Sequence, residues 1–543
     1  MSSRSSSVPT SMGIPPRRRR AVAQAATFLG TVALTVPLLA ACTTGSTTPG
    51  PDASAGDSAK FTIAIASDLD TVDPAQSTTT AAMNVIDYGT QGLTVLDDKG
   101  SVQPALATSW DVSEDGKTLT FHLRKGVKFQ DGAAFTATAA KFNLERLLDT
   151  TIKAPQRTPY TVISSVDAVD ANTLKLTLTQ PAPDLVKQLA STPASFISPD
   201  SVTKDGNTYK NIVHPVGTGP YAFKEFKSGQ EATFTKFNDY WGKKPYYGTV
   251  VFDIVPEANT RESMLLSGQA DMIVSPPVAD LKQLKANSSV SVINAPSVRT
   301  IFMAMNNQQP PFNDEKVRQA LNYAVDKQAI IKNILGGTAQ VADSPLPVGL
   351  SGYCKAGAYP YDPEKAKALL KEAGVGDLSV VLGSPSNHYV QDIQASQAVA
   401  GYLSKVGVTA KVETTDWPSY LANITAPLEK QQYNLHMLGG AAVGLDAQTQ
   451  FNLLRQKNWP PASTATSFYT NPQVETLINE GLVETDQTKR DADLCQAQKI
   501  IWNDAPWIFL WTQNQILAHS SKVEGITTIP NEKYNTISAR PVK

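Results

Sequence analysis

The sequence contains little cysteine and little histidine, with 3 and 5 residues respectively among 543. The histidines are scattered, and no two stand at the spacing of metal ligands, so no metal site is predicted. A Walker A loop, a His-Glu-x-x-His helix and a Gly-x-Ser-x-Gly turn are also absent from the sequence. Because no nucleophile and base can be assigned, the chain is predicted not to be an enzyme and to need no cofactor. A surface-tethered hydrolase is the alternative.

An excess of positive charge is also lacking, since the formal net charge is −1. Residues 1–41 hold five arginines, Arg4 and Arg17 to Arg20, and no acidic residue. Removing those five charges leaves −6, which argues against nucleic acid as a partner. With 41% hydrophobic and 18% charged residues, the composition is that of an ordinary folded protein, and the length suffices for two or three domains.

After residue 41, no stretch is apolar enough to span a bilayer. The one long apolar stretch follows the four consecutive arginines and ends in Leu39-Ala40-Ala41-Cys42. A basic head, an apolar body and a small-residue exit are typical of a cleavable secretory signal. A cysteine at the exit resembles a bacterial lipobox. Residues 1–41 are therefore predicted to be a signal peptide, with Cys42 lipidated and the protein held on the outer face of the cell membrane. The alternative is a one-pass anchor helix.

Residues 42–59 are polar and of low complexity, which predicts a flexible tether between the lipid and the folded part. If Cys42 carries lipid, Cys354 and Cys495 remain. Outside the cytoplasm an even pair can form a disulfide, but sequence does not show whether the two are close enough to bond. A disulfide and two buried thiols are therefore both open.

Strands and helices are mixed along the whole chain after the tether, which predicts an α/β fold. The clearest helix start is Asp362, which stands before Pro363 and an acidic first turn, with Gly374 as the stop. Other helices are expected over 139–148 and within 314–335. Apolar alternation predicts strands over 61–66, 119–123, 173–178, 232–237, 250–255, 290–294, 300–305, 378–382 and 433–438.

Several short motifs follow one another in the order known from one protein family. They are SDLDTVDPA at 67–75, QPALATSW at 103–110, SEDGKTLTFHLRKGVKF at 113–129, GTGPY at 217–221, NDYW at 238–241, GQAD at 268–271, VRQALNYAVD at 317–326 and YDPEKAKALL at 361–370. In these motifs the chain resembles the peptide/nickel-type (family 5) extracytoplasmic solute-binding proteins of ABC importers.

The resemblance implies a two-lobed, periplasmic-binding-protein-like clamshell of type II, with an extra domain in the first lobe. Carried onto this sequence, lobe I takes 60–94, 215–303 and 505–543, the extra domain 95–214, and lobe II 304–504. A ligand bound between the lobes contacts both and favours the closed state. The protein would act as a monomer that delivers its ligand to an ABC permease in the membrane.

The resemblance also suggests ligand-binding residues. In relatives that bind peptides, the segment after the Asp-Pro turn lines the cleft, and here that segment is Thr78, Thr79 and Thr80. The alternative is that these threonines only cap the next helix. A tryptophan of the second lobe also lines the family's cleft, and Trp417 stands at that position. Its flat ring suits apolar side chains or sugar faces. Core packing is the alternative for Trp417.

One loop departs from the family's pattern. Peptide importers carry Gly-Trp after the strand at 433–438, and three residues later an aspartate that pairs with the peptide's α-ammonium. Here the loop starts Gly439, Gly440, Ala441, and Asp446 comes two residues late. Either the loop shifts and Asp446 pairs with the ammonium, or that anchor is gone. An oligopeptide is the preferred ligand; an oligosaccharide or other non-peptide solute, and a sensor role without transport, are the alternatives.

Overall fold

The computed structural model describes residues 56–386 and 388–543. Within this part of the chain, 11 strands form one mixed sheet. Ten strands form one path, and β13 (Ala339–Val341) pairs with β17 beside it. The path runs in the order β15 (Val408–Thr415), β14 (Leu378–Pro385), β16 (Leu435–Gly440), β12 (Val290–Met305), β17 (Trp507–Ser520), β11 (Met272–Val274), β1 (Lys60–Ile65), β10 (Thr249–Ile254), β9 (Glu231–Lys236) and β8 (Tyr221–Lys227).

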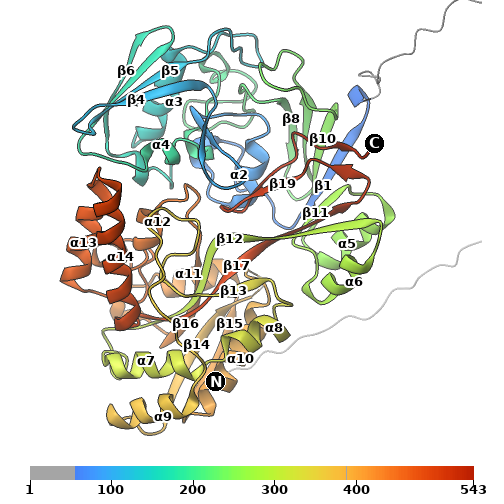
Figure 1. Cartoon of the computed structure of the whole chain (residues 1–543). Helices are drawn as coiled ribbons and strands as arrows, with labels where there is room; N and C mark the ends of the chain where they lie inside the picture. Colours follow the sequence, from blue (N-terminus) through green and yellow to red (C-terminus); the bar gives the residue numbers. More distant parts are fainter. Residues whose placement is uncertain (1–55, 387) are drawn as a thin grey trace, which may run out of the picture. The chain divides into compact units, whose positions relative to one another are not determined.

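Two long antiparallel strands, β12 and β17, join the two halves of this sheet (Figure 1). The segment 300–305 of β12 pairs with β16, whereas 517–519 of β17 pairs with β11 in the other half. Between them, the pairing of β12 with β17 shifts register between Pro296 and Arg299. The two strands therefore pass from one half to the other at this irregularity.

A second, antiparallel sheet has four strands in the order β4 (Ala107–Val112), β5 (Thr118–Leu123), β7 (Thr173–Leu178) and β6 (Ile163–Asp170). Helix α3 (Ala137–Leu148) packs on it and begins at Thr136, whose side chain accepts a hydrogen bond from the Ala139 amide. Side chains of this sheet and helix bury a core of their own, which includes Phe121, Leu144 and Leu176. These residues fall within the segment 95–214 that we expect to be the extra domain, and the division into lobes remains a prediction.

Helices cover the half of the large sheet that carries β14, β15 and β16, and they contribute to two further cores. Small two-stranded pairs complete the fold: β2 (Thr94–Leu96) with β3 (Val102–Pro104), β18 (Val523–Glu524) with β21 (Arg540–Pro541), and β19 (Thr527–Ile529) with β20 (Lys533–Asn535). The remaining α-helices are α2 (Thr80–Ile86), α4 (Leu185–Gln188), α5 (Ala258–Ser267), α6 (Leu281–Ala286), α7 (Glu315–Ala324), α8 (Lys327–Asn333), α9 (Pro363–Glu372), α10 (Asp392–Ser404), α11 (Trp417–Ile424), α12 (Ala447–Phe451), α13 (Pro472–Val483) and α14 (Gln487–Asp504).

Most of the predicted elements are present, with two differences. The strands expected at 290–294 and 300–305 are one 16-residue strand, β12, because the segment between them stays extended and paired through the register shift. The helix expected within 314–335 is α7, and the same segment holds a second helix, α8, which Asp326 caps by accepting a hydrogen bond from the Ala329 amide at 2.9 Å. Helix α9 begins after Asp362, and Gly374 has a positive φ of 71°, as predicted.

The predicted signal peptide, Cys42 and the tether as far as residue 55 lie outside the described residues. The last predicted tether residues, 56–59, already belong to the fold, because the Gly248 amide donates to the carbonyl oxygens of Gly56 and Ala59 at 3.0 Å each. Gly248 allows this approach, since a Cβ there would lie 1.8 Å from the Asp57 oxygen. No helix of the described residues is long and apolar enough to cross a membrane.

Candidate ligand-binding site

The residues of both sheet halves line one cavity of about 240 Å³ next to the crossing of β12 and β17. From one half come the end of β1, the first turn of α2 and the segment 274–278. From the other half comes the loop 388–390 between β14 and α10, and the long strands add Arg299 and 513–516. Glu532 and Tyr534 complete the lining. The cavity is therefore positioned where a ligand would contact both halves.

The cavity is lined by a partly buried ion pair. The Arg299 guanidinium donates to Glu532 through Nε at 2.7 Å and Nη2 at 2.5 Å, and the two side chains are 20% and 13% exposed. Burial opposes the charge of Arg299, but the Glu532 carboxylate outweighs it and the net effect raises the pKa of Arg299. Glu532 has a φ of +66°, and its carbonyl oxygen accepts from Asn84 and Gln515. Arg299 is thus charged at neutral pH, and both side chains are held in place.

Two amide oxygens beside this pair have no hydrogen-bond partner among the described residues, Asn514 Oδ1 and Gln515 Oε1. Both residues belong to β17 and line the cavity. Gln515 is 8% exposed, and its Nε2 is engaged with the Glu532 carbonyl oxygen at 2.7 Å. A buried acceptor without a donor costs free energy. These oxygens are therefore suited to a ligand that carries N–H or O–H groups.

Aromatic rings form the wall on the β14 side. The His388 ring stacks on Trp417 with centroids 3.5 Å apart and an interplanar angle of 4°. Burial, and then the nearby Arg299 charge, lower the pKa of His388 to about 4, so the ring is neutral at pH 7. Trp417 is half-buried, and the cavity lining includes His388 but not Trp417. Trp417 thus supports the wall from behind, and its direct contact with ligand remains a prediction.

The three predicted threonines have different surroundings. Thr78 is exposed and donates through its amide to Asp70 at 2.8 Å, while the Thr79 hydroxyl donates to Asp70 at 3.0 Å. Thr79 also caps α2 by accepting from the Ala82 amide, which is the structural role left open above. Only Thr80 of the three lines the cavity.

The Asp-Pro turn before these threonines is anchored by a buried ion pair. Asp73 is 0% exposed and binds Arg146 of α3 through two hydrogen bonds, at 2.9 and 2.5 Å. Asp73 also caps the short 3₁₀ turn Pro74–Gln76 and accepts from the Ile212 amide at 3.0 Å. This aspartate therefore links the segment before α2 to the four-stranded sheet domain.

The remaining predicted residues lie at the end of β16 and in the loop after it. Gly439 and Gly440, which were expected to start the loop, are instead the last two residues of the strand, paired with Ile301 and Thr300 of β12. The Gly439 amide donates to the Tyr389 hydroxyl at 2.8 Å, and a Cβ on Gly439 would lie 2.8 Å from the Tyr389 ring. A Cβ on Gly440 would lie 2.5 Å from Leu453. Both positions therefore need glycine for packing. Ala441 lines a second, smaller cavity of about 40 Å³, which also includes Met83 of α2.

Asp446 lines this smaller cavity and is 1% exposed. Its carboxylate accepts from the Thr449 amide at 2.7 Å and the Thr449 hydroxyl at 2.9 Å, which caps α12. Burial, and then repulsion from Asp184, raise the pKa of Asp446. No lysine or arginine forms an ion pair with this carboxylate within the described segments. The charge of Lys187 also acts on this carboxylate without forming an ion pair with it. A buried carboxylate without an ion-pair partner is suited to a positively charged group.

Sequence reasoning missed the charged residues of the larger cavity, Arg299 and Glu532. Arg299 carries a signal, because it is the one charged residue in the apolar strand 290–305. Glu532 carries none, since it lies 233 residues away in a short turn. No group of histidine, cysteine, aspartate or glutamate side chains in 56–386 and 388–543 is arranged to hold a metal ion.

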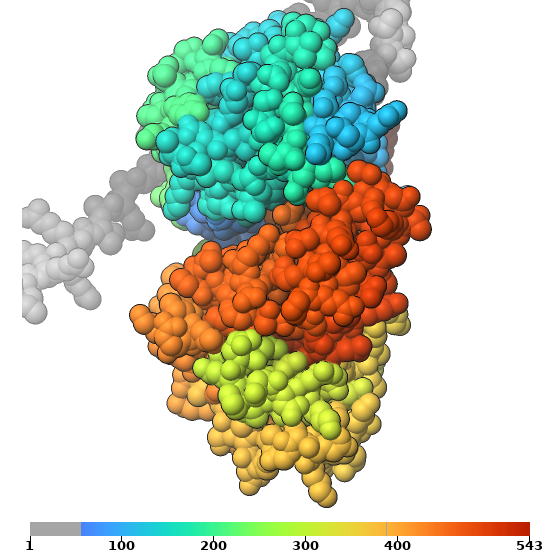
Figure 2. All heavy atoms as spheres, turned by 90° about the vertical axis from the view of Figure 1, so that its left-hand side faces the viewer, coloured from blue at the N-terminus to red at the C-terminus, as the bar shows by residue number. Residues whose placement is uncertain are grey.

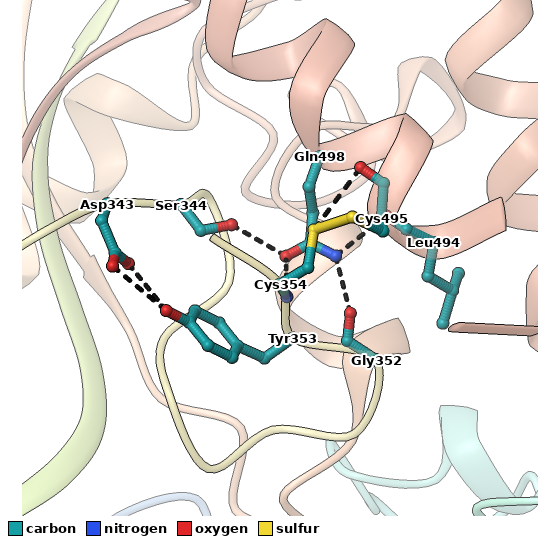
Figure 3. The surroundings of a disulfide bond; sticks show 8 residues. All are labelled: Asp343, Ser344, Gly352, Tyr353, Cys354, Leu494, Cys495 and Gln498. Atoms are coloured by element: carbon teal, nitrogen blue, oxygen red, sulfur yellow. Dashed lines mark hydrogen bonds between the residues drawn. A yellow bond between two sulfur atoms is a disulfide. The ribbon is translucent and has the colours of Figure 1, made fainter. Parts of the chain in front are cut away.

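The cysteine pair is settled by the structure: Cys354 and Cys495 form a disulfide between a long loop and α14, with Cα atoms 5.5 Å apart (Figure 3). Neither cysteine lines the larger or the smaller cavity. Of the two alternatives left open by the sequence, the disulfide is correct.

Comparison with known proteins decides the family. The model of the bacterial extracellular solute-binding proteins, family 5 (middle region), matches residues 101–461. The chain belongs to this family. It is therefore an extracellular solute-binding protein and not an enzyme, which confirms those predictions and removes support from the hydrolase alternative.

Individual relatives agree with this assignment. The chain is similar to the glutathione-binding protein GsiB of Pectobacterium atrosepticum, with 35% identity over 87% of this chain and 92% of that protein. The structure resembles the periplasmic binding protein DppA of Helicobacter pylori in complex with the peptide STSA, with a TM-score of 0.77, 27% identity and coverage of 89% and 98%. It also resembles AgaA of A. tumefaciens R10 in complex with agropinic acid, with a TM-score of 0.74, 27% identity and coverage of 89% and 99%. The predicted fold class, an α/β two-lobed clamshell with an extra domain, is confirmed.

Proposed function

We propose that this protein captures a short peptide between its two lobes and delivers it to an ABC permease in the membrane. The observation that carries the proposal is the cavity beside the β12–β17 crossing, which both sheet halves line. Its polar groups match a peptide's: amide oxygens for N–H donors, and an arginine and a glutamate for terminal charges. Asp446 supplies a second acceptor for a cationic group on the far side of α2.

The relatives support a peptide-like ligand. GsiB is named for glutathione, which is itself a tripeptide, and DppA was solved with the peptide STSA. DppA is described as ABC transporter-associated, which supports delivery to a permease. Lipidation of Cys42 would keep the protein beside that permease, and the lipobox-like sequence supports this part of the proposal.

A non-peptide solute is the second candidate, because AgaA has a similar structure and was solved with agropinic acid. The alanine at position 441, in place of the family's tryptophan, leaves room for such a solute. An oligosaccharide remains a further alternative, as does a sensor role with the same cleft.

Calorimetric titration of the detergent-solubilised full chain separates these candidates. The probes are glutathione, the dipeptide Met-Leu, the tetrapeptide STSA and, as a control, a neutral trisaccharide. We expect saturable one-to-one binding of at least one peptide and no heat from the trisaccharide. Binding of the trisaccharide without binding of any peptide would overturn the proposal.

A further inference from the structure

A carboxylate of the four-stranded sheet domain is bound by two segments of the opposite half of the molecule. Asp184 stands just before α4, and its Oδ2 accepts hydrogen bonds from Arg490 Nη2 of α14 and, at 3.0 Å, from the Ser351 hydroxyl. The side chains of Asp184 and Arg490 are 14% and 3% exposed. Figure 2 shows the teal surface of the domain meeting the red surface of α13 and α14 along this seam.

The two donors, Arg490 and Ser351, are also held by contacts within their own half of the molecule. Arg490 donates through Nε to the Gly481 carbonyl oxygen of α13 at 3.2 Å, so its guanidinium is anchored on the α13–α14 pair. Ser351 lies in a long loop that the Cys354–Cys495 disulfide ties to the same helix, five residues after Arg490 (Figure 3). The disulfide therefore holds both donors on one rigid support.

Gln498 reinforces this support, as Figure 3 shows. Its Oε1 accepts from the Ser344 hydroxyl at 2.8 Å and the Cys354 amide at 3.2 Å, and its Nε2 donates to the Gly352 carbonyl oxygen at 2.7 Å. Gly352 has a φ of +73°, and a Cβ there would lie 2.5 Å from Leu494. The loop is thus packed against α14 at the residue next to Ser351.

The same loop reaches the smaller cavity. The Ser351 amide donates to the Leu445 carbonyl oxygen at 3.2 Å, directly before Asp446. Asp184 and Asp446 are also near enough for their charges to interact. The contacts of Asp184 are therefore continuous with the loop that would hold a ligand's cationic group.

We infer that an interlobe latch holds the clamshell closed over its ligand. The latch consists of Asp184, Ser351, Arg490 and the Cys354–Cys495 disulfide, and Asp184 is its positioning residue. The inference rests on the proposed function. A donor pair that is already ordered loses little conformational freedom when the lobes meet, so the contact favours the closed state. In the open state water solvates the Arg490 guanidinium, so its charge does not need a protein partner.

A crosslink tests the latch without any ligand. A double variant, Asp184→Cys with Ser351→Cys, is treated as the detergent-solubilised full chain with a short bifunctional thiol reagent, and peptide mapping identifies the linked pair. We expect crosslinking and a smaller radius of gyration by small-angle scattering than in the untreated variant. The single variant Asp184→Cys is the control and keeps its radius. Failure to crosslink, or crosslinking with an unchanged radius, would overturn the latch.

Peptide dissociation kinetics provide the second test. Asp184→Asn is expected to release a bound peptide at least fivefold faster, with Asp184→Glu restoring most of the lost residence time. Reduced residence is also expected for Cys354→Ser with Cys495→Ser. Asp170→Asn is the matched control, since Asp170 is exposed on β6 of the same domain.

Ligand-free thermal stability distinguishes a latch from a fixed structural contact. A latch predicts that Asp184→Asn melts within a few degrees of wild type without peptide. Wild-type dissociation rates in Asp184→Asn, or a large loss of ligand-free stability, would contradict the latch. If wild type binds no peptide, the proposed function fails, and the crosslink result still decides the latch by itself.

Discussion

The Arg299 guanidinium and the Glu532 carboxylate form two parallel hydrogen bonds across the cavity, although 233 residues separate them in sequence. Arg299 stands at the register shift of β12, and Glu532 stands in the turn between β19 and β20. The pair therefore ties the crossing strands to the C-terminal turn and supplies both signs of charge to the candidate site.

This pair is expected to stabilise the fold as well as the site. Removing one partner leaves the other charge partly buried and unpaired, so Glu532→Gln should lower the free energy of unfolding by roughly 2 kcal/mol. A double-mutant cycle with Arg299→Met measures the coupling by chemical denaturation. The exposed pair Lys227–Glu231 is the control and should couple by about 0.5 kcal/mol or less. Equal coupling for the two pairs would contradict the assigned role.

Asp446→Asn is expected to change the stability of the ligand-free protein and its affinity for peptide in opposite directions. Burial and Asp184 raise the pKa of Asp446, so its charged form is disfavoured, and the neutral amide should stabilise the ligand-free protein at pH 7. If Asp446 pairs with a ligand ammonium, the same change should weaken peptide binding by roughly 2–5 kcal/mol.

Calorimetry with matched peptides isolates that charge. An N-acetylated peptide lacks the ammonium and should bind wild type and Asp446→Asn equally, whereas the free-amine peptide should lose affinity only for the variant. A free-amine peptide that binds both proteins alike would remove Asp446 from the site.

The buried His436 should make stability fall at acidic pH, and the more exposed His388 should add a smaller effect. Burial lowers the pKa of His436 to about 3, and burial with the Arg299 charge lowers that of His388 to about 4. At pH values between the usual histidine pKa of 6.5 and these lowered pKa values, the unfolded chain binds protons that the folded chain does not. The free energy of unfolding therefore decreases as the pH falls from about 6.5 to 4. Each unit of difference is worth about 1.4 kcal/mol for the buried His436, and less for the exposed His388 because solvent screens its charge.

Denaturant unfolding measured from pH 7 to pH 4 checks this dependence. His436→Asn should flatten the fall, and His122→Asn, which changes an exposed side chain, should not. Parallel pH profiles for wild type and His436→Asn would show that His436 does not contribute.

Cys42→Ser tests the proposed lipid anchor. The serine cannot accept the lipid thioether, so the variant should stay unprocessed or leave the membrane fraction, with altered gel mobility. The paired change Cys354→Ser with Cys495→Ser is the control and should remain in the membrane. Unchanged mobility and membrane association of Cys42→Ser would contradict lipidation.

The sequence predicts local structure well where one local signal decides it. Asp362 and Pro363 mark the start of α9, and the alternation at 173–178 marks β7, because capping and burial act over a few residues. The single strand β12 was not predicted, since Pro296 and the polar residues near it resemble a break. Its continuity depends on pairing with β17, more than 200 residues away.

The candidate site was predictable only in part for the same reason. The family resemblance placed Thr80 and Asp446 beside cavities, and helix capping by Thr79 was one of the alternatives left open, but the position of Trp417 behind His388 was not predicted. Arg299 and Glu532 become a site only after the chain folds. A pair distant in sequence and specified by tertiary contact leaves no spacing pattern to read.

Small-angle scattering of the chain from Asp52 onward, with and without a peptide of measured affinity, tests the central claim most directly. The described residues, 56–386 and 388–543, belong to one compact unit, so the radius of gyration reports on lobe movement. The account predicts that a saturating peptide lowers this radius, whereas a non-binding trisaccharide leaves it unchanged. A peptide that saturates the protein without lowering the radius would contradict capture by closure of the two lobes.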